Sequence, residues 1–341
     1  MPPLTPLLTP DSTPAPHARS PSLDRPIIVT GAAGFIGSHV CAALRRSGRR
    51  VVGVDNFDPF YDIAIKRRAL TRWHDPKDDS AQLFELDLAD PGAFAALAAQ
   101  VRPEGVIHLA AKAGVRPSIA DPAGYARANV VALAAVLEAS ARVGAERVLF
   151  ASSSSVYGNR ETTPFSETDD VNAPNSPYAA TKRAGELMCS THHRLTGLPI
   201  ASLRFFTVFG PGQRPDLAIS LFCNKIHNGE TLRVFGDGST SRDYTFVDDV
   251  VEGTLSAYRN IDAHGYRLWN LGSDTPHRLD EMIQTIGRVV DREPIIEHGP
   301  MQPGDVDKTW ADLTRSQAEL GYAPSVPFEE GVRRQWQDAL A

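Results

Sequence analysis

Tyr178 and Lys182 are the two residues whose types and spacing most directly suggest chemistry. They stand four positions apart at the start of a segment rich in alanine, and this spacing places two side chains on one face of a helix. A phenol has a pKa of about 10, so it needs a neighbouring positive charge before it can act as a base at neutral pH. The pair therefore suits removal of a proton from an alcohol, although the same spacing is also common in surface pairs of amphipathic helices.

A run of serines, Ser152 to Ser155, follows the apolar segment 147–151. If that segment is a parallel strand, the serines lie at the carboxyl end of the sheet, where α/β proteins place their chemistry. A serine hydroxyl at this position can stabilise a developing carbonyl oxygen. Taken alone, the run is equally typical of a solvated loop.

A glycine-rich turn, with Gly31, Gly34 and Gly37, joins the apolar segment 27–30 to a helical segment. Glycines allow a tight turn and let the backbone approach a pyrophosphate, which the helix N-terminus then faces. Asp55 ends the next apolar segment, where a carboxylate would accept hydrogen bonds from the adenosine ribose. A 2′-phosphate would be repelled there, so the pattern favours NAD over NADP. The turn by itself is also compatible with an ordinary strand-to-helix connection.

The elements that must position these residues alternate along the chain. Short apolar runs predict strands at 26–29, 51–54, 105–107 and 147–150, and alanine-rich stretches predict helices over 38–48, 91–101, 125–143 and 177–195. We therefore expect an α/β fold, a Rossmann-type doubly wound parallel sheet with right-handed crossovers.

The pattern loosens after residue 206 and predicts a smaller, mixed C-terminal substrate lobe. Apolar runs at 245–247 and 267–271 indicate that the chain then returns to the sheet. We expect residues 1–25 to be a disordered tail. The NAD-binding Rossmann domain is expected over 26–206 plus 242–275, and the nucleotide-sugar-binding domain over 207–241 plus 276–341.

Composition excludes several classes of function. The formal net charge is −6 and no block of like charge occurs, which argues against nucleic acid or a membrane surface as partner. No segment has the length and hydropathy of a transmembrane helix. Three widely spaced cysteines match neither a disulfide framework nor a zinc site, so we expect no metal and a reducing, cytoplasmic location.

Taken in order, these motifs resemble the extended short-chain dehydrogenase/reductases, within the NAD-dependent epimerase/dehydratase group. The resemblance covers about residues 26 to 322 and is sharpest to UDP-glucuronate 4-epimerases. The segments that carry it are Ala113-Gly-Val-Arg116, Ser153-Ser-Ser-Val-Tyr-Gly158, Tyr178-Ala-Ala-Thr-Lys182, Leu203-Arg-Phe-Phe-Thr-Val-Phe-Gly-Pro211, Arg214-Pro-Asp216, Arg242-Asp-Tyr244 and Gln302-Pro-Gly-Asp-Val306.

The resemblance implies a role for each motif residue. The catalytic residues would be Tyr178, Lys182 and Ser153, with Ser155 as the reserve serine. The cofactor-binding residues would be Gly31, Gly34, Phe35, Ile36, Gly37, Asp55, Asn56, Asp87, Leu88, Leu109, Ala110, Ala111, Lys112, Asn129, Tyr178 and Lys182. The substrate-binding residues would be Ser153, Ser154, Ser155, Thr207, Arg214, Arg242 and Asp305. Asp87 is equally suited to capping a helix with Asp90, and His108 is interpreted as a packed strand-end histidine.

Residue types at the serine run distinguish related chemistries. The similar 4,6-dehydratases carry Asp-Glu before Val-Tyr-Gly, and UDP-glucuronate decarboxylases carry a glutamate at the position of Ser155. This chain has serines there, so the resemblance implies oxidation at C4, turnover of the ketone and return of hydride to its other face. Pro117 and the pair Gly212-Gln213 depart from the family pattern and leave neutral-sugar activity open.

Two alternative functions remain open. UDP-glucose 4-epimerases share the nucleotide site but typically carry asparagine at the position of Thr207. A non-catalytic NAD-binding regulator is the second alternative, against which the retained serine, tyrosine and lysine argue. Segments 125–143 and 177–195 resemble the helices through which family members dimerise, so a homodimer is expected.

Overall fold

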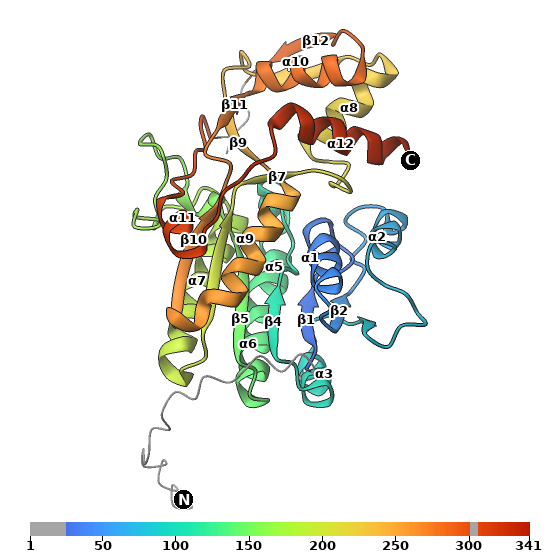
Figure 1. The fold of residues 1–341 in the computed structure, drawn as a ribbon. Coiled ribbons are helices and arrows are strands. Elements are labelled where there is room, and N and C mark those ends of the chain that lie inside the picture. Colours follow the sequence, from blue (N-terminus) through green and yellow to red (C-terminus); the bar gives the residue numbers. More distant parts are fainter. Residues whose placement is uncertain (1–24, 301–305) are drawn as a thin grey trace, which may run out of the picture.

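A large parallel sheet forms the centre of the computed structural model, which describes residues 25–300 and 306–341. Its order is β10-β6-β5-β4-β1-β2-β3 (Figure 1). The strands are β1 (Ile27–Thr30), β2 (Val51–Asp55), β3 (Ala81–Glu85), β4 (Gly105–His108), β5 (Arg147–Ser153), β6 (Ile200–Phe205) and β10 (Tyr266–Leu271). All neighbours are parallel. The predicted α/β doubly wound fold is confirmed.

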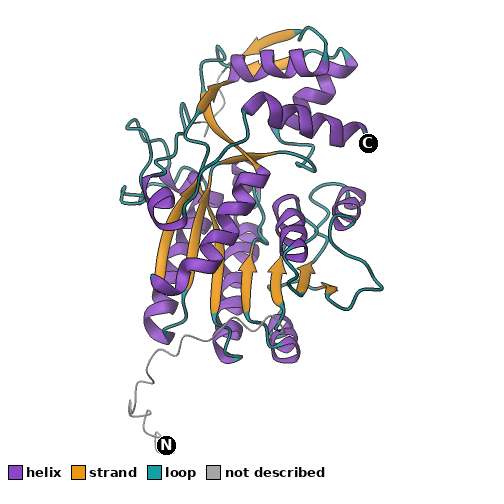
Figure 2. Ribbon diagram, viewed as in Figure 1, coloured by secondary structure: helices purple, strands orange, loops and turns teal. Residues whose placement is uncertain are grey.

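Helices cover both faces of this sheet (Figure 2). Alternate strand residues point to opposite faces, so Val29 packs with α1 and α9 while its neighbour Ile28 packs with α3 and α6. The covering helices are α1 (Phe35–Arg46), α9 (Val247–Asn260), α3 (Ala93–Val101), α6 (Ala132–Arg142) and α7 (Pro177–Thr196). The short helix α2 (Ile63–Leu70) lies beside α1. Burial on both faces explains the continuous apolar runs of these strands.

The helix expected over 125–143 is interrupted in the structure. It consists of α5 (Pro122–Ala126), the π-helical turn η1 (Arg127–Val131) and α6, and it is preceded by α4 (Val115–Ala120). Asp121 caps α5, since its side chain accepts a hydrogen bond from the Gly124 amide, and Pro122 suits the first helical position. The π turn widens the helix at Asn129, and such turns are frequent at functional sites.

The second lobe is smaller and mixed, as predicted, and lies above the carboxyl ends of the large sheet in Figure 1. In its three-stranded sheet, β9 (Ser241–Phe246) pairs parallel with β7 (Thr207–Phe209) and antiparallel with β11 (Pro276–Arg278). The strands β8 (Leu232–Phe235) and β12 (Ile296–Gly299) form a separate parallel pair. Its helices are α8 (Ala218–Asn228), α10 (Leu279–Val290) and α12 (Phe328–Leu340), whereas α11 (Thr314–Leu320) packs beside α9.

One expected strand belongs to a different sheet. The run 245–247 was expected to return to the large sheet, but β9 pairs with β7 in the smaller one, and Val247 already begins α9. The place beside β6 is filled by β10, as the run at 267–271 predicts. Apolar composition alone does not distinguish the two sheets, because both strands have buried residues. In the described ranges, no helix is long and apolar enough to cross a bilayer.

Candidate active site

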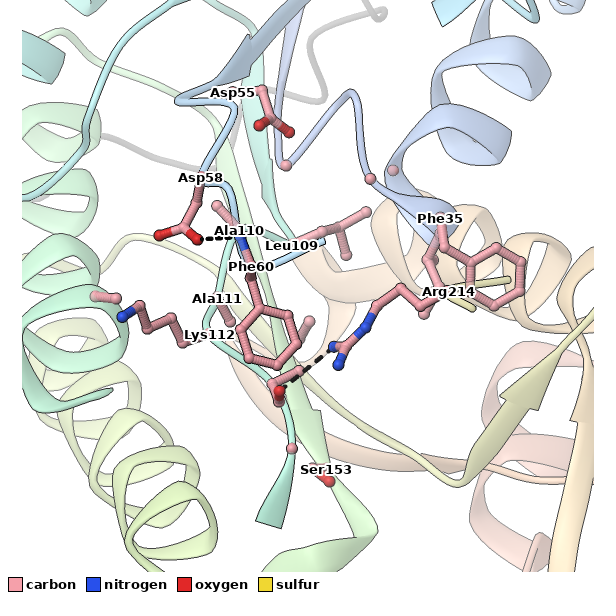
Figure 3. A pocket seen from close by; sticks show the side chains of 18 of the residues that line it. Phe35, Asp55, Asp58, Phe60, Leu109, Ala110, Ala111, Lys112, Ser153 and Arg214 are labelled. Carbon is pink, nitrogen blue, oxygen red and sulfur yellow. Dashed lines mark hydrogen bonds between the residues drawn. The ribbon is translucent and has the colours of Figure 1, made fainter. Parts of the chain in front are cut away.

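A cavity of about 400 Å³ opens at the carboxyl ends of β1, β2, β4 and β5 (Figure 3). It is lined by the glycine-rich turn, the end of β2, the segment after β4, the serine run and the start of α7. This edge is where open parallel sheets bind their ligands. The topology therefore gathers the predicted site residues from segments that are far apart in the sequence.

The glycine-rich turn has the geometry of a phosphate cradle. Gly31 has φ +71°, and a Cβ there would lie 2.9 Å from the Ala110 amide nitrogen. A Cβ on Gly37 would lie 2.0 Å from the Gly31 carbonyl oxygen, so the turn and α1 pack too closely for any side chain. No side chain caps the start of α1 at Gly34, and its first turn holds no acidic residue. The helix N-terminus is thus open to an anion, which fits a dinucleotide pyrophosphate.

Asp55 is buried at the end of β2 and is fixed by two backbone amides. Its Oδ2 accepts from the Ala33 amide at 3.1 Å, and its Oδ1 accepts from the Phe57 amide at 2.9 Å. Each oxygen keeps a lone pair for a ribose hydroxyl. The residues present therefore fit the adenosine end of a dinucleotide.

Lys66 is a cavity residue that sequence inspection missed. It lies on α2, is 7% exposed, and its Nζ is 3.6 Å from Asp55 Oδ1. Its cation partly offsets the repulsion expected between Asp55 and a 2′-phosphate. The sequence offers one signal for Lys66, namely a lysine on the short helix that follows β2. It was missed because only the residues directly after Asp55 were considered as partners of the carboxylate, and Lys66 is not among them.

The remaining predicted cofactor residues, apart from Asn129, line the cavity. They include Phe35, Ile36, Asn56, Asp87, Leu88, Leu109, Ala110, Ala111 and Lys112. The alternative role of Asp87 as a helix cap is wrong, because α3 begins at Ala93 with Gly92 as its N-cap and no side-chain cap. Asp87 Oδ1 instead accepts from the Ala89 amide in the preceding turn, and its Oδ2 pairs with Arg127.

Asn129 differs from the others because its side chain is engaged by protein groups. Its Oδ1 accepts from the Lys112 amide at 2.8 Å, and its Nδ2 donates to the Lys112 carbonyl and the Thr181 hydroxyl. Asn129 does not line the cavity, whereas Lys112 does. The Asn129 side chain therefore supports the backbone of a cavity-lining residue. Direct contact between Asn129 and a cofactor stays a prediction.

The Tyr–Lys pair lies where the spacing predicts, at the start of α7. Ser176 caps this helix by accepting from the Ala179 amide, and Pro177 occupies the first helical position. Lys182 Nζ donates to the Ala151 carbonyl at 2.7 Å and lies 5.9 Å from the centre of the Tyr178 ring. Burial lowers the pKa of Lys182 to about 7.

Ser153 lies beside Tyr178. Burial raises the pKa of Tyr178, and the hydrogen-bonding Ser153 side chain and the Arg214 charge act in the opposite direction. Ser155 supports Ser153, since its hydroxyl accepts from Ser153 Oγ at 3.1 Å and its amide donates to the same oxygen. Ser154 begins the short 3-10 helix η2 (Ser154–Tyr157), and neither it nor Ser155 is a cavity-lining residue.

Thr207 and Arg214 also line the cavity. Arg214 Nε and Nη2 donate to the two oxygens of Asp216 at 2.9 and 2.6 Å. Its Nη1 donates to the Ala113 carbonyl at 3.3 Å, and this bond is the dashed line at Arg214 in Figure 3. The guanidinium lies 4.7 Å from the ring centre of Phe60, which comes from the loop after β2. Sequence inspection gave no role to Phe60, because only the folded chain brings the loop after β2 to Arg214. Asp216 lies two residues from Arg214 in the motif Arg214-Pro-Asp216, so this pairing is local.

Arg242 and His108 lie outside the main cavity lining. Arg242 Nη1 donates to the Ser241 carbonyl at 2.8 Å, next to the fully buried Asp243, which accepts hydrogen bonds from Ser273 and Ala311. His108 is buried against Thr30, its pKa lowered to about 3 by burial and the Lys182 charge, as suits a packed histidine. Asp305 lies outside the described residues. In the part of the chain that is described, no cluster of His, Cys, Asp and Glu could hold a metal ion.

Comparison with known proteins places this site in a family. The model of the NAD dependent epimerase/dehydratase family matches residues 27–272. A probable UDP-glucuronate 4-epimerase of Rhizobium meliloti is 38% identical over 333 residues, covering 91% of this chain and 96% of the relative. A UDP-glucuronate 4-epimerase of Thermodesulfobacterium geofontis is 35% identical over 308 residues, covering 90% and 94%.

Two solved structures are similar over nearly the whole chain. The UDP-glucuronic acid 4-epimerase of Bacillus cereus, in complex with UDP-glucuronic acid and NAD, superposes with a TM-score of 0.85 at 32% identity, covering 92% of this chain and 98% of the other. The UDP-glucose 4-epimerase of Thermotoga maritima, with UDP-glucose, gives a TM-score of 0.82 at 31% identity with the same coverage. The chain belongs to the NAD dependent epimerase/dehydratase family.

Proposed function

We propose that this protein is an NAD-dependent 4-epimerase that interconverts UDP-glucuronate and UDP-galacturonate through a 4-keto intermediate. One observation carries the proposal. Tyr178, Lys182 and Ser153 meet in one cavity with Thr207, Arg214 and the glycine-rich turn, and the serine run adds no carboxyl group. The similarity to UDP-glucuronate 4-epimerases supports this substrate.

The proposed chemistry is carried by three side chains. Tyr178, as phenolate, accepts the proton of the sugar 4-hydroxyl, and Ser153 donates a hydrogen bond to the developing carbonyl oxygen. Lys182 holds the Ala151 carbonyl and so keeps α7 against the end of β5. NAD, when bound, would supply the acceptor and donor of hydride. After the ketone has turned over, Tyr178 would return its proton to the 4-oxygen while hydride is returned to the opposite face of C4, and this inverts that carbon.

A uronate adds a demand that neutral sugars lack. Its 4-keto form is a β-keto acid, which loses carbon dioxide easily, so the protein must hold the carboxylate still. We propose that Thr207, Arg214 and Ser153, which line the cavity, do so, because charge-assisted hydrogen bonds fix a carboxylate in place. Arg214 Nη1 is the nitrogen best placed for this, since Nε and Nη2 are already paired with Asp216.

In this proposal, one lobe binds the cofactor and the other binds the nucleotide sugar. The Rossmann domain, over 26–206 plus 242–275, binds NAD through the glycine-rich turn and Asp55, to which we add Lys66. The smaller lobe binds the UDP moiety, with Arg242 on the diphosphate and Asp305 on the uridine ribose. The free, buried cysteines suit the expected cytoplasmic location.

UDP-glucose is the competing substrate, favoured by the Thermotoga structure and by the pairing of Arg214 with Asp216. The test is to incubate the purified protein separately with UDP-glucuronate, UDP-glucose and UDP-xylose and to identify products by chromatography. We expect UDP-galacturonate from UDP-glucuronate at the highest kcat/KM. Faster turnover of UDP-glucose would reverse the assignment. No turnover of any sugar, with NAD bound, would favour a regulator.

We also propose a homodimer formed through η1, α6 and α7. Val131 and Leu187 are 52% and 54% exposed on these neighbouring helices. Alanines at positions 134 and 180 are also exposed on these helices and would let two helices approach closely. Light scattering should show a dimer at micromolar concentration, and Leu187→Glu should yield a monomer that still binds NAD. A monomeric parent protein would contradict the proposal.

A further inference from the structure

The catalytic helix is docked on the end of β5 by contacts that recur every turn. Tyr178 is beside Ser153, and one turn later Lys182 Nζ donates to the Ala151 carbonyl. One turn further, the carboxylate of Glu186 accepts from Ser152 Oγ at 2.7 Å. Three α7 residues spaced by four thus hold three consecutive residues of the strand that delivers the catalytic serine.

Glu186 is the third of these contacts and has no role in the proposed proton transfer. It is fully buried, and its Oε1 also accepts from Arg204 Nε at 2.8 Å. Its Oε2 accepts from Arg204 Nη2 at 2.9 Å and from Arg183 Nη1 at 3.1 Å. The bidentate pair joins α7 to β6, the strand next to β5. A buried carboxylate satisfied on both oxygens is rigid, because moving it would leave charges unpaired.

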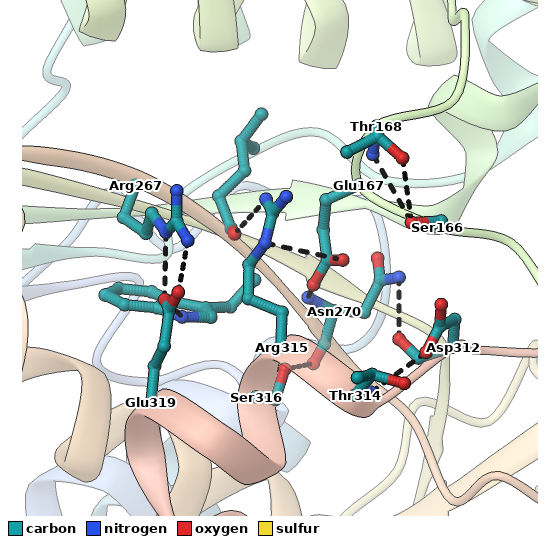
Figure 4. Close-up of polar contacts among 12 residues, drawn as sticks. Ser166, Glu167, Thr168, Arg267, Asn270, Asp312, Thr314, Arg315, Ser316 and Glu319 are labelled. Carbon is teal, nitrogen blue, oxygen red and sulfur yellow. Dashed lines mark hydrogen bonds and ion pairs between the residues drawn. The ribbon is translucent and has the colours of Figure 1, made fainter.

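The same cluster also reaches the end of η2, the short helix that Ser154 begins. The Arg204 guanidinium lies 4.7 Å from the ring centre of Tyr157, the last residue of η2. The Tyr157 hydroxyl donates to Asn270 Oδ1 at 2.7 Å. Asn270 is held in turn by Glu167, which accepts from its amide, and by the carbonyl of Asp312 (Figure 4). The serine run is therefore held at Ser152, and the helix η2 into which it continues is held at Tyr157.

We infer that Glu186, paired with Arg204, is a positioning residue of the reaction: it anchors Ser152 and so holds the neighbouring Ser153 in hydrogen-bonding position against Tyr178. The inference rests on the proposed function. The inference gives Ser152 the role of anchor to Glu186, although Ser152 is also a cavity-lining residue. The four serines then have separate tasks, with Ser153 facing Tyr178, Ser155 supporting Ser153, and Ser154 opening η2.

The anchor should influence the titration of Tyr178. The Ser153 hydrogen bond lowers the pKa of that phenol, so loosening Ser153 should raise it. The other groups facing Tyr178 are Lys182 on α7, Tyr125 on α5 and Arg214 from the smaller lobe, with His108 beside Lys182. None of these is changed when Ser152 is replaced. A loss of stability alone would lower the amount of active protein without moving the pH dependence.

The mild variant is Ser152→Ala, which removes one bond and leaves the Arg204–Glu186 pair intact. We expect kcat to fall about tenfold, the effect of losing roughly one hydrogen bond to a charged group, with KM changed less than about twofold. The acid limb of the kcat–pH profile should move to higher pH. Ser140→Ala is the matched control, since Ser140 is buried with one hydrogen bond inside α6, and it should match the parent in both respects.

The stronger variant is Glu186→Met combined with Arg204→Met, which removes the acceptor of Ser152 Oγ and both charges, so that neither is left buried and unpaired. It should bind NAD and show the same shift. Tyrosinate absorbance of the holoprotein, with Tyr178→Phe as reference, reports the pKa of Tyr178 without turnover and should rise in both variants. An unchanged pKa, or a defect confined to KM, would overturn the inference. The proposed function itself would fail by a different result, namely that the parent protein turns over no UDP-sugar.

Discussion

Removal of the Arg214 side chain should separate uronate recognition from the chemistry shared by all UDP-sugars. Arg214 lines the cavity with a side chain only 14% exposed, so solvent screens its charge little. Asp216 occupies Nε and Nη2, which leaves Nη1, now on the Ala113 carbonyl at the long distance of 3.3 Å. One charge-assisted bond to the substrate carboxylate is therefore available.

The size of the effect follows from that single bond. A hydrogen bond to a charged group contributes about 1.5–3 kcal/mol, so Arg214→Ala should lower kcat/KM for UDP-glucuronate about ten- to 150-fold. Arg214 also lowers the pKa of Tyr178, so its loss should slow both substrates by a common factor at a given pH. The informative quantity is the ratio of kcat/KM for UDP-glucuronate to that for UDP-glucose, which should fall by the full ten- to 150-fold.

The assay is chromatography of both reactions at one pH, with Arg46→Ala as control. Arg46 is exposed at the end of α1 and does not line the cavity. Its substitution therefore removes the same charge away from the site. If the grip on the carboxylate also suppresses decarboxylation, the Arg214 variant should release some UDP-4-keto-pentose. An unchanged ratio would place Arg214 on the diphosphate or in a structural role, and uronate recognition would then rest on Thr207 and Ser153.

Three further predictions concern the catalytic pair and the turn. Tyr178→Phe should fold and bind NAD but lose about 10²- to 10⁴-fold in kcat, and activity within a few-fold of the parent would exclude the phenolate mechanism. Gly37→Ala should lower the free energy of unfolding by about 1–3 kcal/mol or more and reduce the NAD released on denaturation, because its Cβ would collide with the Gly31 carbonyl. Lys182→Met should stabilise the protein more at pH 6 than at pH 9.5. Folding lowers the lysine pKa from 10.5 to about 7, so the penalty for burying the charge is full below pH 7 and fades as the pH rises towards 10.5. Equal stabilisation at both pH values, measured by thermal unfolding, would refute that titration.

Local sequence determined the elements and most of the chemistry-bearing residues. Buried parallel strands need continuous apolar runs, and β1, β2, β4 and β5 all lie where such runs occur. The start of α7 is encoded by Ser176 and Pro177, which satisfy or remove the unpaired amides of a first helical turn. Spacing by four then placed Tyr178 and Lys182 on one face without reference to any other part of the chain.

Tertiary structure decided which distant groups meet. Lys66 approaches Asp55, Phe60 stacks on Arg214, and Glu186 holds Ser152, and each pair joins segments whose separation in sequence carries no periodic signal. The assignment of β9 to the smaller sheet was likewise settled by pairing with β7, since apolar patterning is the same in either sheet. Propensity, capping and periodicity act over a few neighbouring residues, so they determine helices, strands and turns. Contacts between segments depend on the packing of the whole chain, which is why the partners of Asp55, Arg214 and Ser152 emerged only from the fold.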